Sequence, residues 1–429
     1  MPNPVNTSIY GAYAREILDS RGNPTIETTV VLESGYRATI AIPSGASVGI
    51  SEAFELRDKD EKRYNGKGVL KAVSNVNSII SPAIKGKDAA KQADIDRLMI
   101  DLDGTPTKKN LGANAILSVS MGAALAVSQA YRTPLYVYLN SLFSTSIPTA
   151  ITKIPTPIFN MINGGKHGAG NLDFQEFWMI PASNKPYTTA LEMGVILRTA
   201  ISQILTQKNL ARSIGDEGGF APNLFTNMEV FDILLEAVRV SPYQFGIDIF
   251  FGLDLAASEF YSDKGYTIKD RPHAFSTKEF IEYLKILHDK YHLLLLEDPL
   301  AQNDWSGWKL LNGSMGEDTL LIGDDLLTTN YTLLSKAIEN QSCDGIMLKP
   351  NQIGTLSEFF GVVKLAKEKN IKCVVGHRSG ETNDSFIADL AVAIQSDYVK
   401  FGSPNRGERI AKYNRLLAID SEIRSSQRT

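Results

Sequence analysis

The sequence has 429 residues, of which 43% are hydrophobic and 21% are charged, as in an ordinary folded globular protein. Its 44 basic and 48 acidic residues give a net charge of −4, which provides no basic excess for binding nucleic acid or an anionic membrane surface. Two cysteines, Cys343 and Cys373, are too few for a disulfide framework, so we expect a reducing compartment.

The N-terminal segment lacks the basic start and apolar core of a signal peptide. The segment richest in apolar residues, 115–131, is interrupted by serines, a glycine and a glutamine, so no membrane span is expected. We therefore expect a cytoplasmic protein with neither nucleic acid nor a membrane as its partner.

The first third of the chain has the pattern of a short antiparallel sheet followed by helices. Residues 26–30 alternate as in a half-buried strand, 33–35 have the composition of a turn, and 36–42 are expected to form the returning strand. Farther on, apolar residues recur at helical spacing: Val69, Val73, Val76 and Ile80. Residues 111–131 form another predicted helix. These elements predict a smaller α+β domain over residues 1–145.

A linker rich in Ser, Thr and Pro over residues 141–157 leads into the second predicted domain, 146–429. Beyond it, short apolar runs recur, each followed by an ionisable residue: Asp254, Glu297, Asp324, Lys349, His377 and Lys400. The intervals of 43, 27, 25, 28 and 23 residues each leave room for a helix, such as 333–340 or 356–369. Continuous apolar strands are buried on both faces and hence parallel, and six or more such units favour a closed barrel.

The C-terminal ends of barrel strands meet at one mouth, where active sites form. Asp254, Glu297 and Asp324 would place three carboxylates there, and like charges in a low-dielectric space raise one another's pKa. A hard divalent cation resolves this conflict, and oxygen-only ligands suit Mg²⁺, with Mn²⁺ as second choice. The alternative is a salt-bridge network with Lys349 and Lys400, which needs no metal.

Lys349 and Lys400 would share this mouth with the cation. Burial and a nearby cation lower the pKa of a lysine, which could then remove a carbon-bound proton next to a carboxylate. A cation that holds the resulting enolate is the usual companion of such a base. The neighbouring Arg378 and Ser379 would suit a phosphate, although a solvated loop would have the same composition.

Two acidic residues lie in glycine-rich surroundings upstream. Glu217 lies within the Gly-Asp-Glu-Gly-Gly segment 215–219, and Glu176 follows the loop 163–167. They could form a general acid pair opposite the lysine base, and the alternative is an ordinary turn. Residues 45–49 match the G-x-S-x-G pattern but follow a short hairpin, which argues against a serine hydrolase.

With these residues in view, the chain closely resembles the enolase family, from about Tyr10 to Ile419. The matching segments, in order, are PSGAS (43–47), NGG (163–165) with His167, QEF (175–177), GDEGG (215–219), EDP (297–299), GDDL (323–326), NQIGT (351–355) after Lys349, and SGET (379–382). The resemblance implies a TIM-like (β/α)8 barrel with one reversed strand, the second, preceded by the smaller domain. It also implies the Mg²⁺-dependent, reversible dehydration of 2-phosphoglycerate to phosphoenolpyruvate in glycolysis, by a homodimer or octamer.

The resemblance assigns two Mg²⁺ ions to each active site. Asp254, Glu297 and Asp324 would bind the first ion, and Ser47 would complete the second site together with the substrate. The residues that it assigns to catalysis are Lys349, Glu217, Glu176 and His377. The residues that it assigns to substrate binding are His167, Glu176, Lys349, Arg378, Ser379 and Lys400.

Within this set, each residue is expected to have a separate task. Lys349 would take the C2 proton, and Glu217, supported by Glu176, would protonate the departing 3-hydroxyl. Lys400 would meet the substrate carboxylate. Arg378 and Ser379 would hold the phosphate, and His167 and His377 would close around it.

Four positions depart from the usual family pattern: Val48, Gly168, Pro350 and Gly376. Val48 and Gly168 lie on loops expected to close over substrate, so they bear on closure and affinity rather than on the class of reaction. Pro350 should hold Lys349 extended, as at the end of a strand. Two other functions remain open: a catalytically silent homologue that binds a partner, and a relative acting on another carboxylate substrate.

Overall fold

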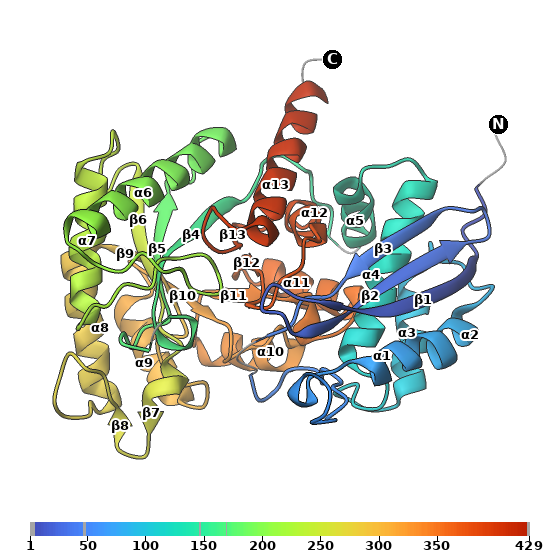
Figure 1. Ribbon diagram of the computed structural model, residues 1–429, viewed down its shortest axis with the longest axis horizontal. Coiled ribbons are helices and arrows are strands. Elements are labelled where there is room, and N and C mark those ends of the chain that lie inside the picture. The colour runs from blue at the N-terminus through green and yellow to red at the C-terminus, as the bar shows by residue number, and fades with distance from the viewer. Residues whose placement is uncertain (1–4, 46–48, 146, 169, 427–429) are drawn as a thin grey trace.

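The computed structural model describes residues 5–45, 49–145, 147–168 and 170–426. The chain begins with an antiparallel sheet of β1 (Ile9–Leu18), β2 (Pro24–Leu32) and β3 (Arg37–Ala41), in that order. The expected hairpin over 26–42 is confirmed, with Val30 opposite Ala38 in register. Alternate residues of β2 are buried, so one face of the sheet packs against helices (Figure 1).

The helices of this domain follow the sheet in the chain: η1 (Tyr64–Gly66), α1 (Leu70–Asn75), the π-helical turn η2 (Val76–Ile80), α2 (Ser81–Ile84), α3 (Gln92–Asp103), α4 (Ala113–Ala130) and α5 (Leu135–Ser144). The predicted helix over 111–131 corresponds to α4. Among the described residues, α4 alone has the length and hydropathy of a membrane span, and it is 89% buried within the protein. This burial is what the central helix of a folded domain shows.

The second part of the chain is a closed barrel of eight strands. In chain order these are β4 (Thr156–Asn163), β5 (Glu176–Pro181), β6 (Ile249–Asp254), β9 (Leu293–Glu297), β10 (Leu320–Gly323), β11 (Gly345–Leu348), β12 (Lys372–Gly376) and β13 (Tyr398–Lys400). β5 runs antiparallel to both β4 and β6, whereas the other neighbours are parallel. The predicted barrel with a reversed second strand is therefore confirmed.

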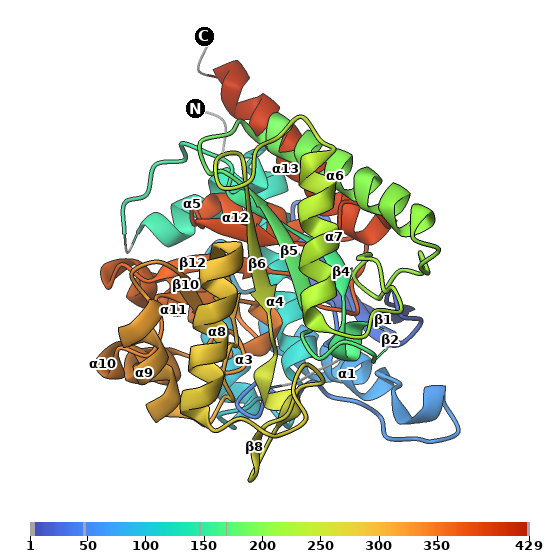
Figure 2. The same cartoon turned by 90° about the vertical axis from the view of Figure 1, so that its left-hand side faces the viewer.

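Helices surround this barrel on the outside (Figure 2). They are α6 (Tyr187–Gln207), α7 (Asn227–Arg239), α8 (Thr277–Tyr291), α9 (Trp305–Met315), α10 (Tyr331–Asn340), α11 (Leu356–Glu368), α12 (Phe386–Ala393) and α13 (Gly407–Ser426). Short elements complete the barrel domain: η3 (Gly165–His167), η4 (Ala257–Phe260), β7 (Tyr261–Ser262), β8 (Gly265–Tyr266) and η5 (Pro350–Gln352). The helices predicted at 333–340 and 356–369 correspond to α10 and α11.

The two parts of the chain meet at the barrel mouth. The backbone N–H groups of Ser44 and Gly380 each donate to the other residue's carbonyl, at 2.7 and 2.9 Å, and Ser20 N–H donates to the Glu381 carbonyl at 2.7 Å. The loops that follow β1 and β3 in the first domain therefore pack against the segment that follows β12 at the mouth. The predicted division near residue 145 lies between α5 and β4 and stays a prediction.

Apolar side chains fill the barrel below this mouth. They form a cluster separate from the larger core around the barrel and consist of Ile158, Trp178, Ile180, Leu295, Ile322, Met347 and Val374, all fully buried. The barrel is thus a packed structure with a floor, and its polar side chains can gather only above that floor.

Removing part of this floor should destabilise the protein. Leu295→Ala is expected to lower the free energy of unfolding by about 2–5 kcal/mol, because the surrounding barrel cannot collapse onto the cavity. Urea unfolding measures the change. Leu310→Ala is the matched control, because Leu310 is 46% exposed on α9 and its truncation should change stability by about 0.5 kcal/mol or less. Equal effects of the two changes would contradict a packed barrel interior.

Candidate active site

The six ionisable residues that follow predicted strands gather at one end of the barrel. Asp254, Glu297 and Lys400 are the last residues of β6, β9 and β13. Asp324, Lys349 and His377 come one residue after β10, β11 and β12. All six are buried, and none is more than 9% exposed. The structure therefore brings together every one of these candidates.

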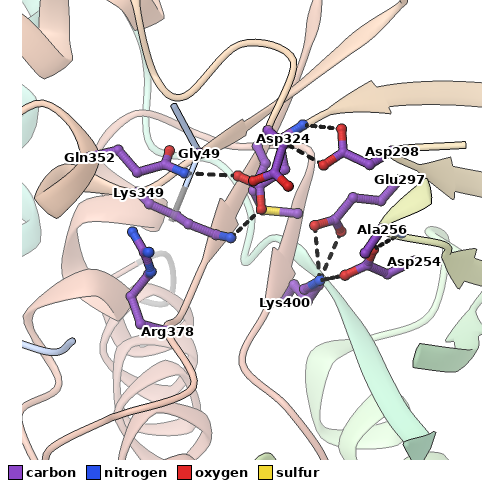
Figure 3. A network of polar contacts seen from close by, with 12 residues as sticks. Gly49, Asp254, Ala256, Glu297, Asp298, Asp324, Lys349, Gln352, Arg378 and Lys400 are labelled. Carbon is purple, nitrogen blue, oxygen red and sulfur yellow. Dashed lines mark hydrogen bonds and ion pairs between the residues drawn. The ribbon is translucent and has the colours of Figure 1, made fainter. Parts of the chain in front are cut away.

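Two lysines lie among the three carboxylates (Figure 3). Lys400 Nζ lies 3.0 Å from Asp254 Oδ2 and 2.8 Å from Glu297 Oε2. Lys349 Nζ donates a short hydrogen bond to Asp324 Oδ2. This arrangement is the salt-bridge network that the sequence left open as an alternative to a bound metal.

The pKa values follow from these pairs. Burial is the largest single influence on Lys349 and lowers its pKa, but the attraction of the neighbouring carboxylates, Asp324 first and Glu297 next, raises the pKa overall. Burial raises the pKa of the Asp324 carboxyl, but the Lys349 ammonium opposes this effect and brings the pKa down to about 2. The lowering of the lysine pKa expected beside a bound cation stays a prediction, because here carboxylates are the nearest charges to Lys349.

Glu297 behaves in the opposite way. Burial and the neighbouring charges of Asp254 and Asp324 hold its pKa well above the usual range, even with Lys400 beside it. The mouth therefore has more negative charge than its two lysines balance. An all-oxygen donor set with surplus negative charge fits a hard divalent cation such as Mg²⁺ or Mn²⁺.

Sequence reasoning missed two acidic neighbours of the expected metal ligands. Asp298 accepts hydrogen bonds from the backbone N–H groups of Asp324 (3.0 Å) and Asp325 (2.7 Å), which orients that segment. Carboxylate oxygens of Asp298, Asp324 and Asp325 lie within 4.8 Å of one another. The doublets Glu297-Asp298 and Asp324-Asp325 in the sequence are the signal that could have identified them. The acidic set at the mouth is therefore wider than the predicted trio.

The predicted acid pair forms on the other side of the mouth. His167 Nδ1 lies 3.4 Å from Glu176 Oε1 and 3.5 Å from Glu217 Oε1, and His377 Nε2 lies 3.3 Å from Glu217 Oε2. Burial, reinforced by the Glu217 charge, raises the pKa of Glu176 to about 7. Burial also opposes ionisation of Glu217, but the two histidines bring its pKa well below the usual range. The pair can therefore hold one proton, chiefly on Glu176.

The reversed strand explains how Glu176 reaches this site. Because β5 runs antiparallel to its neighbours, its first residue lies at the mouth, and Glu176 pairs in register with Asp254 at the end of β6. Its other carboxylate oxygen accepts a 2.8 Å hydrogen bond from Trp178 Nε1. Glu176 precedes its apolar run, so the pattern of ionisable residues after strands does not find it.

The expected phosphate residues lie beside the first domain. Arg378 is 5% exposed, and its Nη1 donates to Glu52 Oε2 at 2.9 Å and Asn351 Oδ1 at 3.1 Å. Ser379 is also buried. The alternative of a solvated loop is therefore wrong. Glu52 was not predicted from the sequence, because nothing local indicates a partner 326 residues away.

The four unusual positions have different outcomes. Val48 lies outside the described residues, as does Ser47, the expected ligand of the second metal ion. Lys349 is extended, with φ −132° and ψ 108°, as expected before Pro350. A Cβ at Gly168 would lie 2.5 Å from the Asn163 carbonyl oxygen, so the loop as it stands has no room for alanine.

Gly376 lies close to the side chain of Lys349, the candidate base. A Cβ there would be 2.6 Å from Met347 Sδ and 3.1 Å from Lys349 Cε. Gly376→Ser should therefore displace both buried side chains and lower the free energy of unfolding by about 1–3 kcal/mol. Chemical unfolding of single and double variants measures the effect, and Gly376→Ser should have a smaller effect in a Met347→Ala background.

Gly361 on α11 provides the control for this prediction. A Cβ there has no described heavy atom within 4 Å, so Gly361→Ser should not destabilise the protein by steric contact. Strict additivity of Gly376→Ser and Met347→Ala would contradict the proposed contact.

Comparison with known families covers nearly the whole chain. The family model described as the enolase N-terminal domain matches residues 9–139. The model described as the enolase C-terminal TIM barrel domain matches residues 151–428. Both matches agree with the fold, a smaller domain followed by a closed barrel. The resemblance found in the sequence is confirmed, and the chain belongs to the enolase family.

Proposed function

We propose that this protein catalyses the reversible dehydration of 2-phosphoglycerate to phosphoenolpyruvate and water, with Mg²⁺ as cofactor. One observation carries the proposal beyond family membership. In the barrel order β10-β11-β12-β13-β4-β5-β6-β9, the strand before Lys349 and the strand that begins at Glu176 are four positions apart in a ring of eight. The strands next to Lys349 and Glu176 therefore lie on opposite sides of the barrel, which supports a reaction in which a base and an acid act on opposite faces of a substrate.

Lys349 is proposed as the base that removes the C2 proton. Its nitrogen is held at the end of β11 by the extended backbone before Pro350 and by a 2.9 Å hydrogen bond from Lys349 N–H to Thr329 Oγ1. As long as Asp324 is its ion-pair partner, Lys349 keeps its proton. Lys349 would become a base when Asp324 binds Mg²⁺ in place of the lysine ammonium.

Asp254, Glu297 and Asp324 are proposed to hold Mg²⁺, with Ser47 and the substrate completing a second site and Mn²⁺ as a substitute. The ions would supply positive charge that balances these carboxylates and stabilises negative charge on the substrate. Lys400 would then be free to turn from Asp254 and Glu297 toward the substrate carboxylate.

Glu217 and Glu176 are proposed to deliver a proton to the departing 3-hydroxyl. The raised pKa of Glu176 keeps a proton available near neutral pH, and His167 lies within 3.5 Å of both carboxylates. Arg378 and Ser379 would bind the phosphate, with His167 and His377 beside it. A planar guanidinium suits this task because it binds phosphate oxygens in pairs.

The assembly and location of the protein are also proposals. Membership of the enolase family supports a small-molecule substrate, and we propose a homodimer or octamer in the cytoplasm. Light scattering of the purified protein would distinguish these assemblies. The acidic net charge supports the absence of a nucleic-acid partner.

The reaction can be followed directly. Purified protein with Mg²⁺ and 2-phosphoglycerate should produce a rise in ultraviolet absorbance from the enol phosphate, and Lys349→Ala should lower kcat by at least about 10²-fold. Lys364→Ala is the control, because Lys364 is partly exposed on α11 and should leave the rate unchanged. Full activity of Lys349→Ala would remove Lys349 from its role, and an inactive native protein would favour a partner-binding homologue or another substrate.

Metal binding can be tested without turnover. Mg²⁺ should raise the melting temperature, because it binds the folded mouth and not the unfolded chain. Asp254→Asn should abolish most of this increase, whereas Asp263→Asn in the exposed turn between β7 and β8 should retain it. A Mg²⁺ effect of equal size in both variants would contradict a site at Asp254.

A further inference from the structure

Arg409 is a fully buried arginine in the first turn of α13 that the proposed reaction does not use. Its Nη1 donates to His377 Nδ1 at 2.8 Å and to the Arg378 carbonyl at 2.6 Å. Its Nη2 donates to the carbonyls of Ser379 at 2.7 Å and Asp216 at 3.1 Å. One guanidinium therefore joins the proposed phosphate segment to the loop that carries Glu217.

The contact with His377 determines the state of the imidazole ring. A guanidinium has donors and no acceptor, so Nδ1 of His377 must accept the hydrogen bond. The ring proton is then on Nε2, which lies 3.3 Å from Glu217 Oε2. We propose that Arg409 is a positioning residue that fixes His377 as the neutral Nε2–H tautomer and directs this proton at the Glu217 carboxylate.

The charges around the ring support this assignment. The charged groups that face His377 are Glu217 from the 215–219 loop, Arg409 from α13, and Glu381 from its own loop. Burial and the positive charge of Arg409 lower the pKa of His377 to about 4, against the opposing attraction of the two glutamates. The ring therefore stays uncharged at neutral pH. The catalytic use of its proton rests on the proposed function, whereas the state of the ring does not.

Lys412 offers a matched control, because it holds the same loop through other residues. It is buried one turn farther along α13, and its Nζ lies 2.7 Å from Glu381. It also donates to the carbonyls of Thr382 at 3.0 Å and Asp384 at 2.8 Å. Loss of Lys412 should loosen the loop without removing the donor to His377.

The test is nuclear magnetic resonance of the full chain carrying ¹⁵N- and ¹³C-labelled histidine, without substrate or metal. The His377 signal is assigned by its loss in His377→Gln. In the native protein we expect the neutral Nε2–H tautomer throughout a titration from pH 5.5 to 8. In Arg409→Met the titration midpoint should rise by about two pH units, toward the ordinary histidine value near 6.5, and the Nδ1–H tautomer should become populated. Lys412→Met should leave the ring as in the native protein.

The proposal would be overturned if His377 of the native protein were charged or in the Nδ1–H form at pH 6. It would also be overturned if His377 in Arg409→Met had the same tautomer and pKa as in the native protein. If Arg409→Met does not fold, the tautomer of the native protein still decides. Turnover is not involved, so an inactive protein with the expected tautomer would count against the proposed function alone. An active protein with the other tautomer would count against Arg409 alone.

Discussion

Negative charge buried away from water is the constraint on which the rest of the barrel mouth depends. Asp254, Glu297 and Asp324 end up in one enclosed space because parallel strands bring their C-terminal ends together. Carboxylates placed this way repel one another and lose hydration, so each needs a positive partner. Lys349 and Lys400 supply two for these three carboxylates, and burial together with the charge of Asp254 raises the pKa of Glu297. The mouth is thus suited to binding a further cation.

The reversed strand β5 places an acid at the mouth through its first residue. In a parallel strand the residue at the mouth is the last one, and its neighbours continue into a loop. In β5 the residue at the mouth is the first one, so Glu176 is held by the strand on one side and by Trp178 below it. This gives a fixed carboxylate beside the less regular 215–219 loop. The two members of the acid pair therefore differ in pKa and also in their backbone, since Glu176 belongs to a strand and Glu217 to a loop.

Most of the architecture could be predicted because its signals are local and repeated. Ionisable residues after apolar runs identified the mouth, since strand periodicity fixes which residue comes at the end. Glu176 was proposed from the glycine-rich loop before it and not from the pattern of residues after strands, because its strand runs in the opposite direction. Glu52 and Arg409 could not be predicted, since their contacts join segments far apart in the chain. The burial of Lys349 could be expected from the apolar run before it, whereas its ion pair with Asp324 depends on the three-dimensional arrangement of two strands.

The contact between Glu52 and Arg378 has a consequence for how such a protein can be divided or recombined. The barrel carries most of the chemistry, yet an arginine at its mouth is neutralised by a carboxylate from the other domain. A barrel without the first domain, or joined to the first domain of another protein, would lose Glu52 as the partner of Arg378. The electrostatic potential at the proposed phosphate site would then change. We therefore expect that exchanging one domain for that of a distant relative preserves the charge balance of the mouth only when both Glu52 and Arg378 are retained.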